Sequence, residues 1–218
     1  MQTLIPPALF AALPVKITFQ GGATDTFFSP TMDYFQYVFL KILEKMGGKI
    51  EINIIKRGYY PEGAAKAEIM IHPVKLKNLN LTERGPLQKI LAISGASEFL
   101  KDRKVAERQL AGVREVFGKL KLPTEERAEY YNTQCPGSQV CLLAEFENTV
   151  IGVDNLGKLG KRAEDVGKET ALELVNKIKS KLNDKNRETI LKIKNEMKSQ
   201  GWGKVVSGMD VYNAVLDK

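Results

Sequence analysis

The sequence contains few residues of the types from which disulfide frameworks and metal centres are built. Its 218 residues include two cysteines, one tryptophan and one histidine. Cys135 and Cys141 lie six positions apart in an otherwise cysteine-free chain, which fits neither a disulfide framework nor a metal-binding knuckle. We therefore expect both thiols to be reduced and no metal ion to be held by the protein's own side chains.

The sequence also lacks a long hydrophobic run. Its longest apolar stretch, LIPPALFAALPV at residues 4–15, is interrupted by three prolines and is too short to span a bilayer. No basic segment precedes this stretch and no clear cleavage site follows it, unlike in a signal peptide. We expect a cytoplasmic protein that does not bind a membrane.

The sequence has fewer acidic than basic residues. The chain has 33 Lys and Arg against 26 Asp and Glu, which gives a net charge of +7 and a pI of about 9.2. A basic chain suits a polyanionic partner, since each phosphate that Lys or Arg neutralises releases counterions. Such a charge is also common on proteins that bind no nucleic acid, so it favours an RNA or nucleotide ligand without establishing one.

Helical spacing of apolar residues is found in four segments. A helix from Asp33 is expected to end at Gly47 and Gly48, because glycine commonly terminates helices. The N-terminal segment is expected to tolerate its two prolines in the first turn. A glycine-rich stretch, IGVDNLGKLGKR, is expected to lead into the last helix. The four predicted helices span residues 2–13, 33–46, 102–120 and 163–181.

Short alternating or β-branched runs predict the strands. KIEINII and AEIMI flank a turn with Pro61 and Gly63, residues whose backbone preferences suit a hairpin. Residues 122–148 offer two more strands around a Pro-Gly turn. The other predicted strands are VKITFQ at residues 15–20 and LQKILAISGAS at residues 87–97. Together with the helices they indicate a mixed α/β protein.

Six phrases in this sequence match one family in their order: GGATDTFFSPTMDYF, RGYYPEG, NLTERGPLQKILAIS, VAERQL, CPGSQVCLLAEFEN and GKRAEDVGKETALEL. They resemble the RNA 3′-terminal phosphate cyclases, particularly the archaeal members, over about residues 2–179. The resemblance implies an α/β (α+β) fold of βαβαββ repeats with an inserted small α/β domain. Residues 1–98 would form partial repeats plus the first strand of the next, residues 99–181 the insertion, and residues 182–218 a tail of unrecognised type.

The resemblance also implies a chemistry. In the family, ATP with Mg²⁺ or Mn²⁺ adenylylates a histidine, and AMP then passes to an RNA 3′-phosphate. The neighbouring 2′-hydroxyl displaces AMP and closes a 2′,3′-cyclic phosphate. The expected partners are therefore RNA 3′ ends, and a second polypeptide or self-association would complete the sheet, because an incomplete sheet exposes an edge.

Two groups of residues match binding phrases of the family. A nucleotide-binding group is implied at Gln2, Pro30, Asp33 and Tyr34. A phosphate- or RNA-binding group is implied in the hairpin, at Arg57 and Gly63. Two structural alternatives stand beside these roles: Asp33 would only cap its helix, and Arg57 would be a surface arginine at a strand end.

The sequence departs from the family in two ways. Glu62, Ala64 and Ala65 replace a basic residue and two glycines of the hairpin, which weakens anion binding because alanine narrows the backbone geometry and a carboxylate repels phosphate. The family's catalytic histidine and first repeat are not matched, and His72 corresponds to no catalytic position. No catalytic residue is therefore identified.

The alternative function is a catalytically inactive, cyclase-like RNA-binding or rRNA-processing scaffold. An enolpyruvyl transferase is a more remote alternative, because it rests on fold analogy alone.

Overall fold

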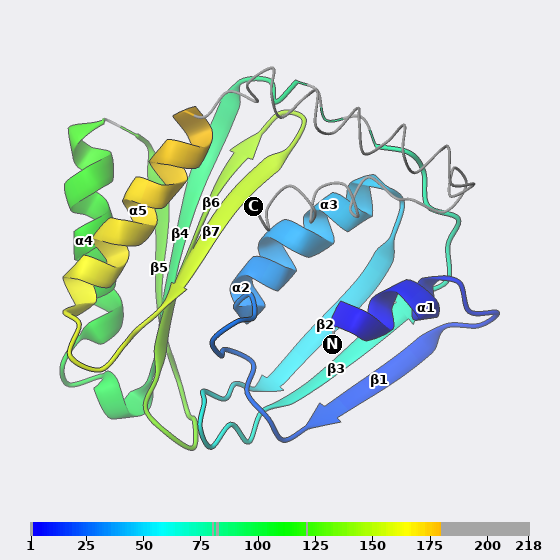
Figure 1. Cartoon of the computed structure of the whole chain (residues 1–218), viewed down its shortest axis with the longest axis horizontal. Coiled ribbons are helices and arrows are strands. Elements are labelled where there is room, and N and C mark those ends of the chain that lie inside the picture. The colour runs from blue at the N-terminus through cyan, green and yellow to red at the C-terminus, as the bar shows by residue number, and fades with distance from the viewer. Residues whose placement is uncertain (1, 80, 82, 121, 180–218) are drawn as a thin grey trace.

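The computed structural model describes residues 2–79, 81, 83–120 and 122–179. The predicted tail, residues 182–218, lies outside the described residues. The described chain forms four layers: two helices, a four-stranded sheet, a middle layer of helices, and a three-stranded sheet (Figure 1). The predicted α/β class is confirmed.

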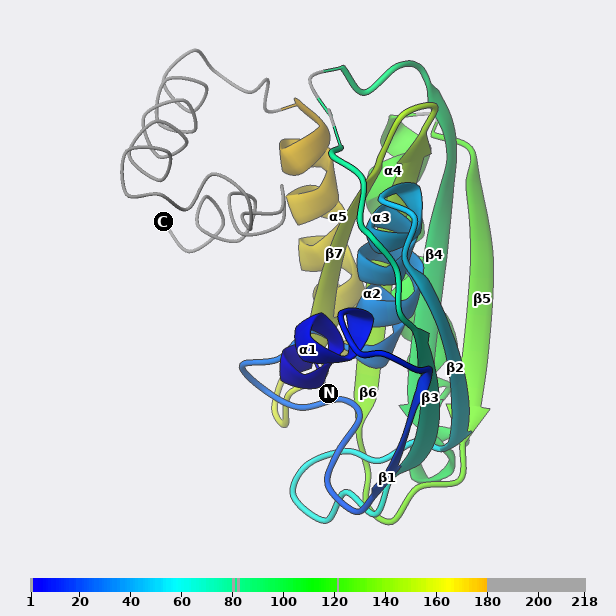
Figure 2. The same cartoon turned by 90° about the vertical axis from the view of Figure 1, so that its right-hand side faces the viewer.

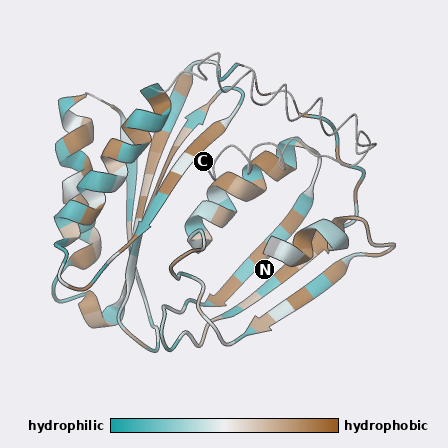
Figure 3. Ribbon diagram, viewed as in Figure 1, coloured by the Kyte–Doolittle hydropathy of each residue, from teal (hydrophilic) through white to brown (hydrophobic). Residues whose placement is uncertain are grey.

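The three-stranded sheet has the order β1-β3-β2, and both pairings are antiparallel. Its strands are β1 (Val15–Gln20), β2 (Lys49–Lys56) and β3 (Lys66–His72). Alternate residues of each strand are mostly apolar and more buried, and the residues between them are more exposed and polar except for Ile55 and Met70 (Figure 3). The predicted hairpin of β2 and β3 is therefore confirmed, with its apolar side chains on one face as the alternation requires.

Most of the middle layer is one continuous helical segment of three parts: α2 (Met32–Tyr34), the π-helical turn η2 (Phe35–Phe39) and α3 (Leu40–Lys45). Thr31 caps it, because its hydroxyl accepts a hydrogen bond from the Tyr34 N–H at 3.2 Å. The alternative role of Asp33 as the cap is therefore wrong. The segment ends before Gly47 at φ +90°, as predicted.

This helical segment packs against both sheets. Phe35 and Leu43 join β3 in one apolar cluster, which also includes α1 (Ile5–Leu9). On the opposite side, Val38 packs against residues of β4 and β6 in a second cluster. One helix therefore contributes side chains to two cores.

The N-terminal helix is shorter than predicted. A 3-10 turn, η1 (Gln2–Leu4), leads into α1, and Pro6 and Pro7 occupy the first turn as expected. The helix stops at Leu9 instead of continuing to residue 13. Leu13 precedes Pro14, and a residue in that position is disfavoured in helical conformation.

The four-stranded sheet has the order β5-β4-β6-β7. Its strands are β4 (Leu87–Ser97), β5 (Thr124–Tyr131), β6 (Ser138–Phe146) and β7 (Val150–Leu156). The central β4 runs parallel to β5 and antiparallel to β6. The two strands predicted around the Pro-Gly turn are both present, but β4 lies between them and they do not form a hairpin.

Strand β7 was not predicted, because the sequence of this segment indicates only a glycine-rich stretch before the last helix. Gly152 faces the middle helix at a point where a Cβ would lie 2.4 Å from Val38 Cγ2. The glycine therefore marks close packing inside a strand instead of a loop. Strand β4, which we grouped with the first segment, pairs with the strands of the second. The three-segment division itself stays a prediction.

Helices α4 (Val105–Lys119) and α5 (Ala163–Lys179) cover the outer face of this sheet and confirm two predicted helices (Figure 1). They cross closely: a Cβ on Gly112 would lie 1.9 Å from the carbonyl oxygen of Glu164, and one on Gly167 would lie 1.8 Å from that of Gln109. In the described part of the chain, no helix has the length and apolarity needed to cross a membrane.

Replacing Gly112 by alanine tests this crossing. The added methyl group has no room against the α5 backbone, so we expect the free energy of unfolding to fall by about 1–3 kcal/mol or more. Gly118 is the matched control in the same helix, because a Cβ there would have nothing within 4 Å. Gly118→Ala should raise stability by about 0.5–1 kcal/mol. Urea denaturation followed by circular dichroism measures both, and equal effects would refute the close crossing.

Candidate functional site

A buried arginine lies where the two sheets and the middle helix meet. Arg57 immediately follows β2, and its side chain is 7% exposed. The guanidinium donates to both carboxylate oxygens of Asp33, with 3.0 Å from Nη1 to Oδ2, and reaches Asp25 at 3.5 Å. It also lies over the ring of Tyr131, 4.5 Å from the centroid. This two-pronged geometry is the strongest that an Arg–carboxylate pair adopts.

The carboxylates of this cluster have further partners. Asp33 Oδ2 accepts a hydrogen bond from Gln139 Nε2 at 3.0 Å, and Gln139 Oε1 accepts one from the Tyr59 hydroxyl. Asp25 accepts from the Met32 N–H at 3.0 Å and from the Thr24 hydroxyl at 2.8 Å. The cluster therefore connects the hairpin, the β1–α2 loop, the middle helix and β6.

The cluster holds one cation and two carboxyl groups away from water. Burial raises the pKa of Asp25; Arg57 lowers it in part, and Asp33 raises it further. Burial lowers the pKa of Arg57, but Asp33 and Asp25 raise it by more, so the guanidinium stays charged. Burial also raises the pKa of Tyr59, which keeps its hydroxyl protonated as a hydrogen-bond donor.

The hairpin turn packs closely against the β1–α2 loop. A Cβ on Gly63, at φ +65°, would lie 2.1 Å from the carbonyl oxygen of Gly22. The Ala65 N–H donates to that same oxygen at 3.0 Å, and the Gly63 N–H donates to Tyr59. These two N–H groups therefore bind backbone carbonyls of the chain itself. Ala64, which stands where the resemblance implies a glycine, has φ +55°, a conformation that favours glycine.

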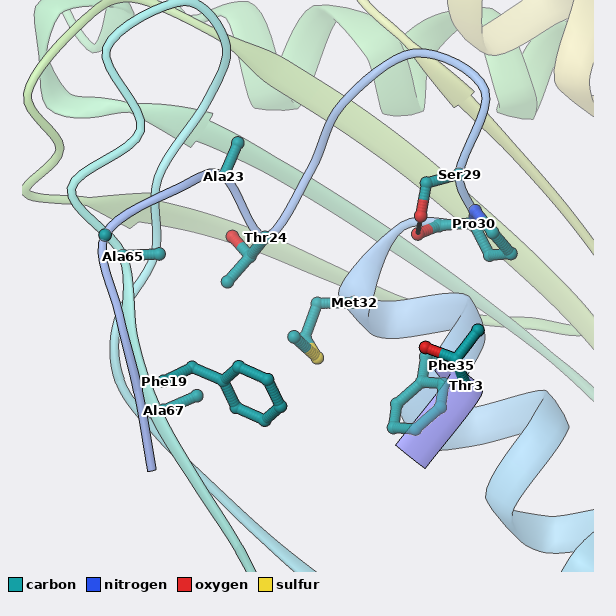
Figure 4. A pocket seen from close by; sticks show the side chains of 11 residues that line it. Thr3, Phe19, Ala23, Thr24, Ser29, Pro30, Met32, Phe35, Ala65 and Ala67 are labelled. Atoms are coloured by element: carbon teal, nitrogen blue, oxygen red, sulfur yellow. Dashed lines mark hydrogen bonds between the residues drawn. The ribbon is translucent and has the colours of Figure 1, made fainter. Parts of the chain in front are cut away.

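A cavity of about 320 Å³ lies between the β1–α2 loop, the start of α2 and the N-terminal turn. Phe19, Met32 and Phe35 direct their side chains into it (Figure 4). Thr3 and Ser29 are exposed and lie at its rim. None of its lining residues is charged; they are Thr3, Phe19, Gly21, Ala23, Thr24, Ser29, Pro30, Met32, Phe35, Ala65 and Ala67.

The structure separates the predicted nucleotide-binding residues. Pro30 lines the cavity, and Gln2 belongs to the 3-10 turn that supplies Thr3. Asp33 points into the ion cluster, and Tyr34 packs with the second sheet. Of the predicted phosphate group, Arg57 is in the ion cluster and Gly63 is in the tight turn. The binding roles of all six residues stay predictions.

Several residues of the site were missed by sequence reasoning. Asp25 lies inside a phrase that carries the resemblance, but it was not singled out. Gln139 and Tyr131 come from the second sheet, 106 residues from Asp33 in the case of Gln139. Asp154 was missed as well, and its carboxylate accepts from the Thr31 N–H at 2.6 Å. Tyr131, Gln139 and Asp154 belong to strands of the second sheet, and the sequence did not predict how these strands pair.

His72 lies apart from this site. It is the last residue of β3, and its Nε2 is 3.3 Å from a carboxylate oxygen of Glu51. Because Ala67 of the same strand faces the cavity, the alternation of β3 directs His72 to the opposite face of the sheet. The structure thus places its ring beside Glu51 on the outer face and away from the cavity.

The fold and site define an α/β protein with an uncharged cavity beside a buried Arg–Asp cluster. A model of the RNA 3′-terminal phosphate cyclase family matches residues 1–215, farther than the phrases at residues 2–179. The chain belongs to this family, and the predicted recognition is confirmed.

Relatives named RNA 3′-terminal phosphate cyclase are similar to most of the chain. One from Pyrobaculum aerophilum is 42% identical over 182 residues, which is 82% of this chain and 51% of the relative. One from Pyrobaculum neutrophilum is 39% identical, and one from Ignicoccus hospitalis is 36% identical; each match covers 82% of this chain and 52% of the relative. The chain spans about half the length of the curated relatives it matches.

Removing the arginine tests the ion cluster. Arg57→Ala leaves two buried carboxyl groups without their cation, so we expect stability at pH 7 to fall by about 3–5 kcal/mol. The folded variant should bind a proton more tightly than the unfolded chain, because burial raises the pKa of Asp25 and the variant lacks the arginine that lowers it in part. Its stability should therefore rise as the pH falls toward about 4. Denaturation at both pH values measures this.

The control for this variant is Arg127→Ala, which breaks an exposed ion pair with Glu125 and should cost no more than about 1 kcal/mol. Equal losses for the two variants would contradict the structural importance of Arg57.

The strained hairpin residue offers a stabilising change. Ala64→Gly removes the Cβ from a left-handed backbone conformation and should raise stability by about 1 kcal/mol. The neighbouring buried Ala65 has no positive φ, so Ala65→Gly should lower stability by about 0.4–1 kcal/mol through greater freedom of the unfolded chain. The melting temperatures of both variants, measured by thermal unfolding, test this prediction. A lower melting temperature for Ala64→Gly would contradict the assignment of strain.

Proposed function

We propose that this chain is the part of an RNA 3′-terminal phosphate cyclase that holds the nucleoside of ATP. The observation that carries the proposal is the uncharged cavity beside Pro30. Its apolar floor and its hydroxyl groups at the rim suit a flat base, because ligand sites typically combine apolar walls with few polar groups. Membership of the family and the relatives' printed names support the same reading.

The proposed reaction is that implied by the resemblance. A histidine nitrogen attacks the α-phosphate of ATP and displaces pyrophosphate, and the AMP then passes from the histidine to the RNA 3′-phosphate. The 2′-hydroxyl attacks that phosphate and displaces AMP, which closes the 2′,3′-cyclic phosphate. The described residues of this chain would position the nucleoside and the RNA end, which lowers the barrier by orienting the reacting groups. No residue of this chain is assigned the nucleophilic role.

The cavity fits the base better than the triphosphate. Its lining contains no lysine or arginine, and Arg57 is already paired with two carboxylates. Cations for the phosphates would therefore come from outside this lining, from Mg²⁺ or Mn²⁺ carried with ATP. Among the described residues, no group of three or more His, Cys, Asp and Glu is placed to hold such an ion.

The remaining parts of the proposal concern partners and location. A second polypeptide or self-association would complete the sheet by pairing with an exposed edge. The partner nucleic acid would be an RNA 3′ end. A cytoplasmic location fits the two cysteines, which are both free and buried, as expected in a reducing compartment.

Binding of fluorescently labelled ATP, measured by anisotropy and by competition with unlabelled ATP, tests the proposal. Ser29 is exposed at the rim of the cavity, so Ser29→Trp should obstruct entry without disturbing the core. We expect the affinity for ATP to fall at least about tenfold, which corresponds to about 1.4 kcal/mol.

Ser29→Ala is the matched control and should bind ATP nearly as the unaltered chain does. Unchanged binding by Ser29→Trp would place the nucleotide elsewhere. RNA binding without any ATP binding would favour the inactive scaffold instead.

A further inference from the structure

Two phenylalanines are exposed in the loop that joins β1 to α2. The side chain of Phe28 is fully exposed, and that of Phe27 is 45% exposed. Phe28 also has φ +65°, a conformation that is a genuine outlier for a bulky residue. Two adjacent exposed rings, one of them on a strained backbone, are not explained by packing within the chain and therefore indicate a role in binding.

A lysine from a second loop lies beside the first loop. Lys158, in the loop between β7 and α5, places its Nζ 5.8 Å from the ring centroid of Phe27, within cation–π range. The two loops lie close together at the edge of the molecule (Figure 2). Within the described part of the chain, Lys158 takes part in no ion pair with a carboxylate, and its neighbour Leu159 is fully exposed. We call Phe27, Phe28 and Lys158 the aromatic platform.

The aromatic platform adjoins the cavity. Phe28 directly precedes Ser29 and Pro30, which line the cavity. The hydrogen bond from the Thr31 N–H to Asp154 ties the end of the first loop to β7, the strand that leads into the second loop. A ligand on the platform would therefore lie at the mouth of the proposed nucleoside site.

We propose that the aromatic platform stacks bases of single-stranded RNA next to the 3′ end. This inference rests on the proposed function, because it assigns the RNA to the side of the cavity where Phe28 stands. Exposed rings beside a lysine that pairs with no carboxylate of the described residues suit this ligand: rings stack on any base, and the cation attracts the backbone phosphate. An apolar protein partner would leave that lysine without a counterion.

The test is RNA binding by the full chain without ATP. The probe is a ten-nucleotide RNA with a 3′-phosphate and a 5′ fluorophore, followed by anisotropy. Phe28→Ala should weaken binding about tenfold, the order expected for the loss of one stacked base, whereas Phe28→Tyr should retain it. Phe10→Ala is the matched control, since Phe10 is 70% exposed on another part of the surface.

Three further measurements distinguish RNA binding from a structural role. 2-Aminopurine placed near the RNA 3′ end should lose fluorescence on the unaltered chain and much less on Phe28→Ala. Phe28→Gly should raise the melting temperature by relieving the positive φ, while it weakens RNA binding as Phe28→Ala does. Lys158→Gln should make binding less dependent on salt, because one phosphate contact is lost.

Unchanged RNA affinity in Phe28→Ala, or no RNA binding by the unaltered chain, would overturn the inference. So would a Phe28→Ala effect confined to self-association in sedimentation, which would make the aromatic platform a contact between copies. The RNA assay contains no ATP, so its outcome is separate from that of the nucleotide assay. ATP binding with unchanged RNA affinity in Phe28→Ala would remove the aromatic platform alone.

Discussion

The rest of the structure depends on one buried ion pair, between Arg57 and Asp33. Removing charges from water is expensive, and good geometry with further hydrogen bonds is needed to offset that cost. Here Asp25, Gln139 and the ring of Tyr131 supply the additional contacts. Because these residues come from both sheets, the loop and the helix, satisfying the charges fixes the position of each element and so the walls of the cavity.

The polar groups of the β2–β3 hairpin bind partners within the chain itself. Its arginine is directed inward, and two of its N–H groups bind carbonyl oxygens of the chain itself. Ala64 keeps the left-handed conformation that glycine would adopt more easily. The turn therefore remains closed by contacts with the β1–α2 loop, and the lining of the adjacent cavity contains no charged residue. Because the arginine and these N–H groups are already paired within the chain, the cavity suits the base of a nucleotide better than its phosphates.

Sequence reasoning predicted what depends on local patterns. The alternation of KIEINII, the turn with Gly63 and the helical spacing after Asp33 are all encoded within a few residues. It failed where distant segments decide. Strand β7 contains a glycine that fits against Val38, and β5 is separated from β6 by β4. Arg57 and Gln139 bind Asp33 across 24 and 106 positions of the sequence. The sequence shows these residues, but it does not show that they pair.

The middle helix has a consequence for folding. It places Phe35 and Leu43 in one core and Val38 in the other, so neither sheet can bury its inner face until this helix is in place. Melting the helix would expose Leu91, Ile93 and Leu143 on one side and Ile69 and Ile71 on the other. The two halves should therefore unfold in a single cooperative transition, although a diagram of their strands alone suggests two separable modules.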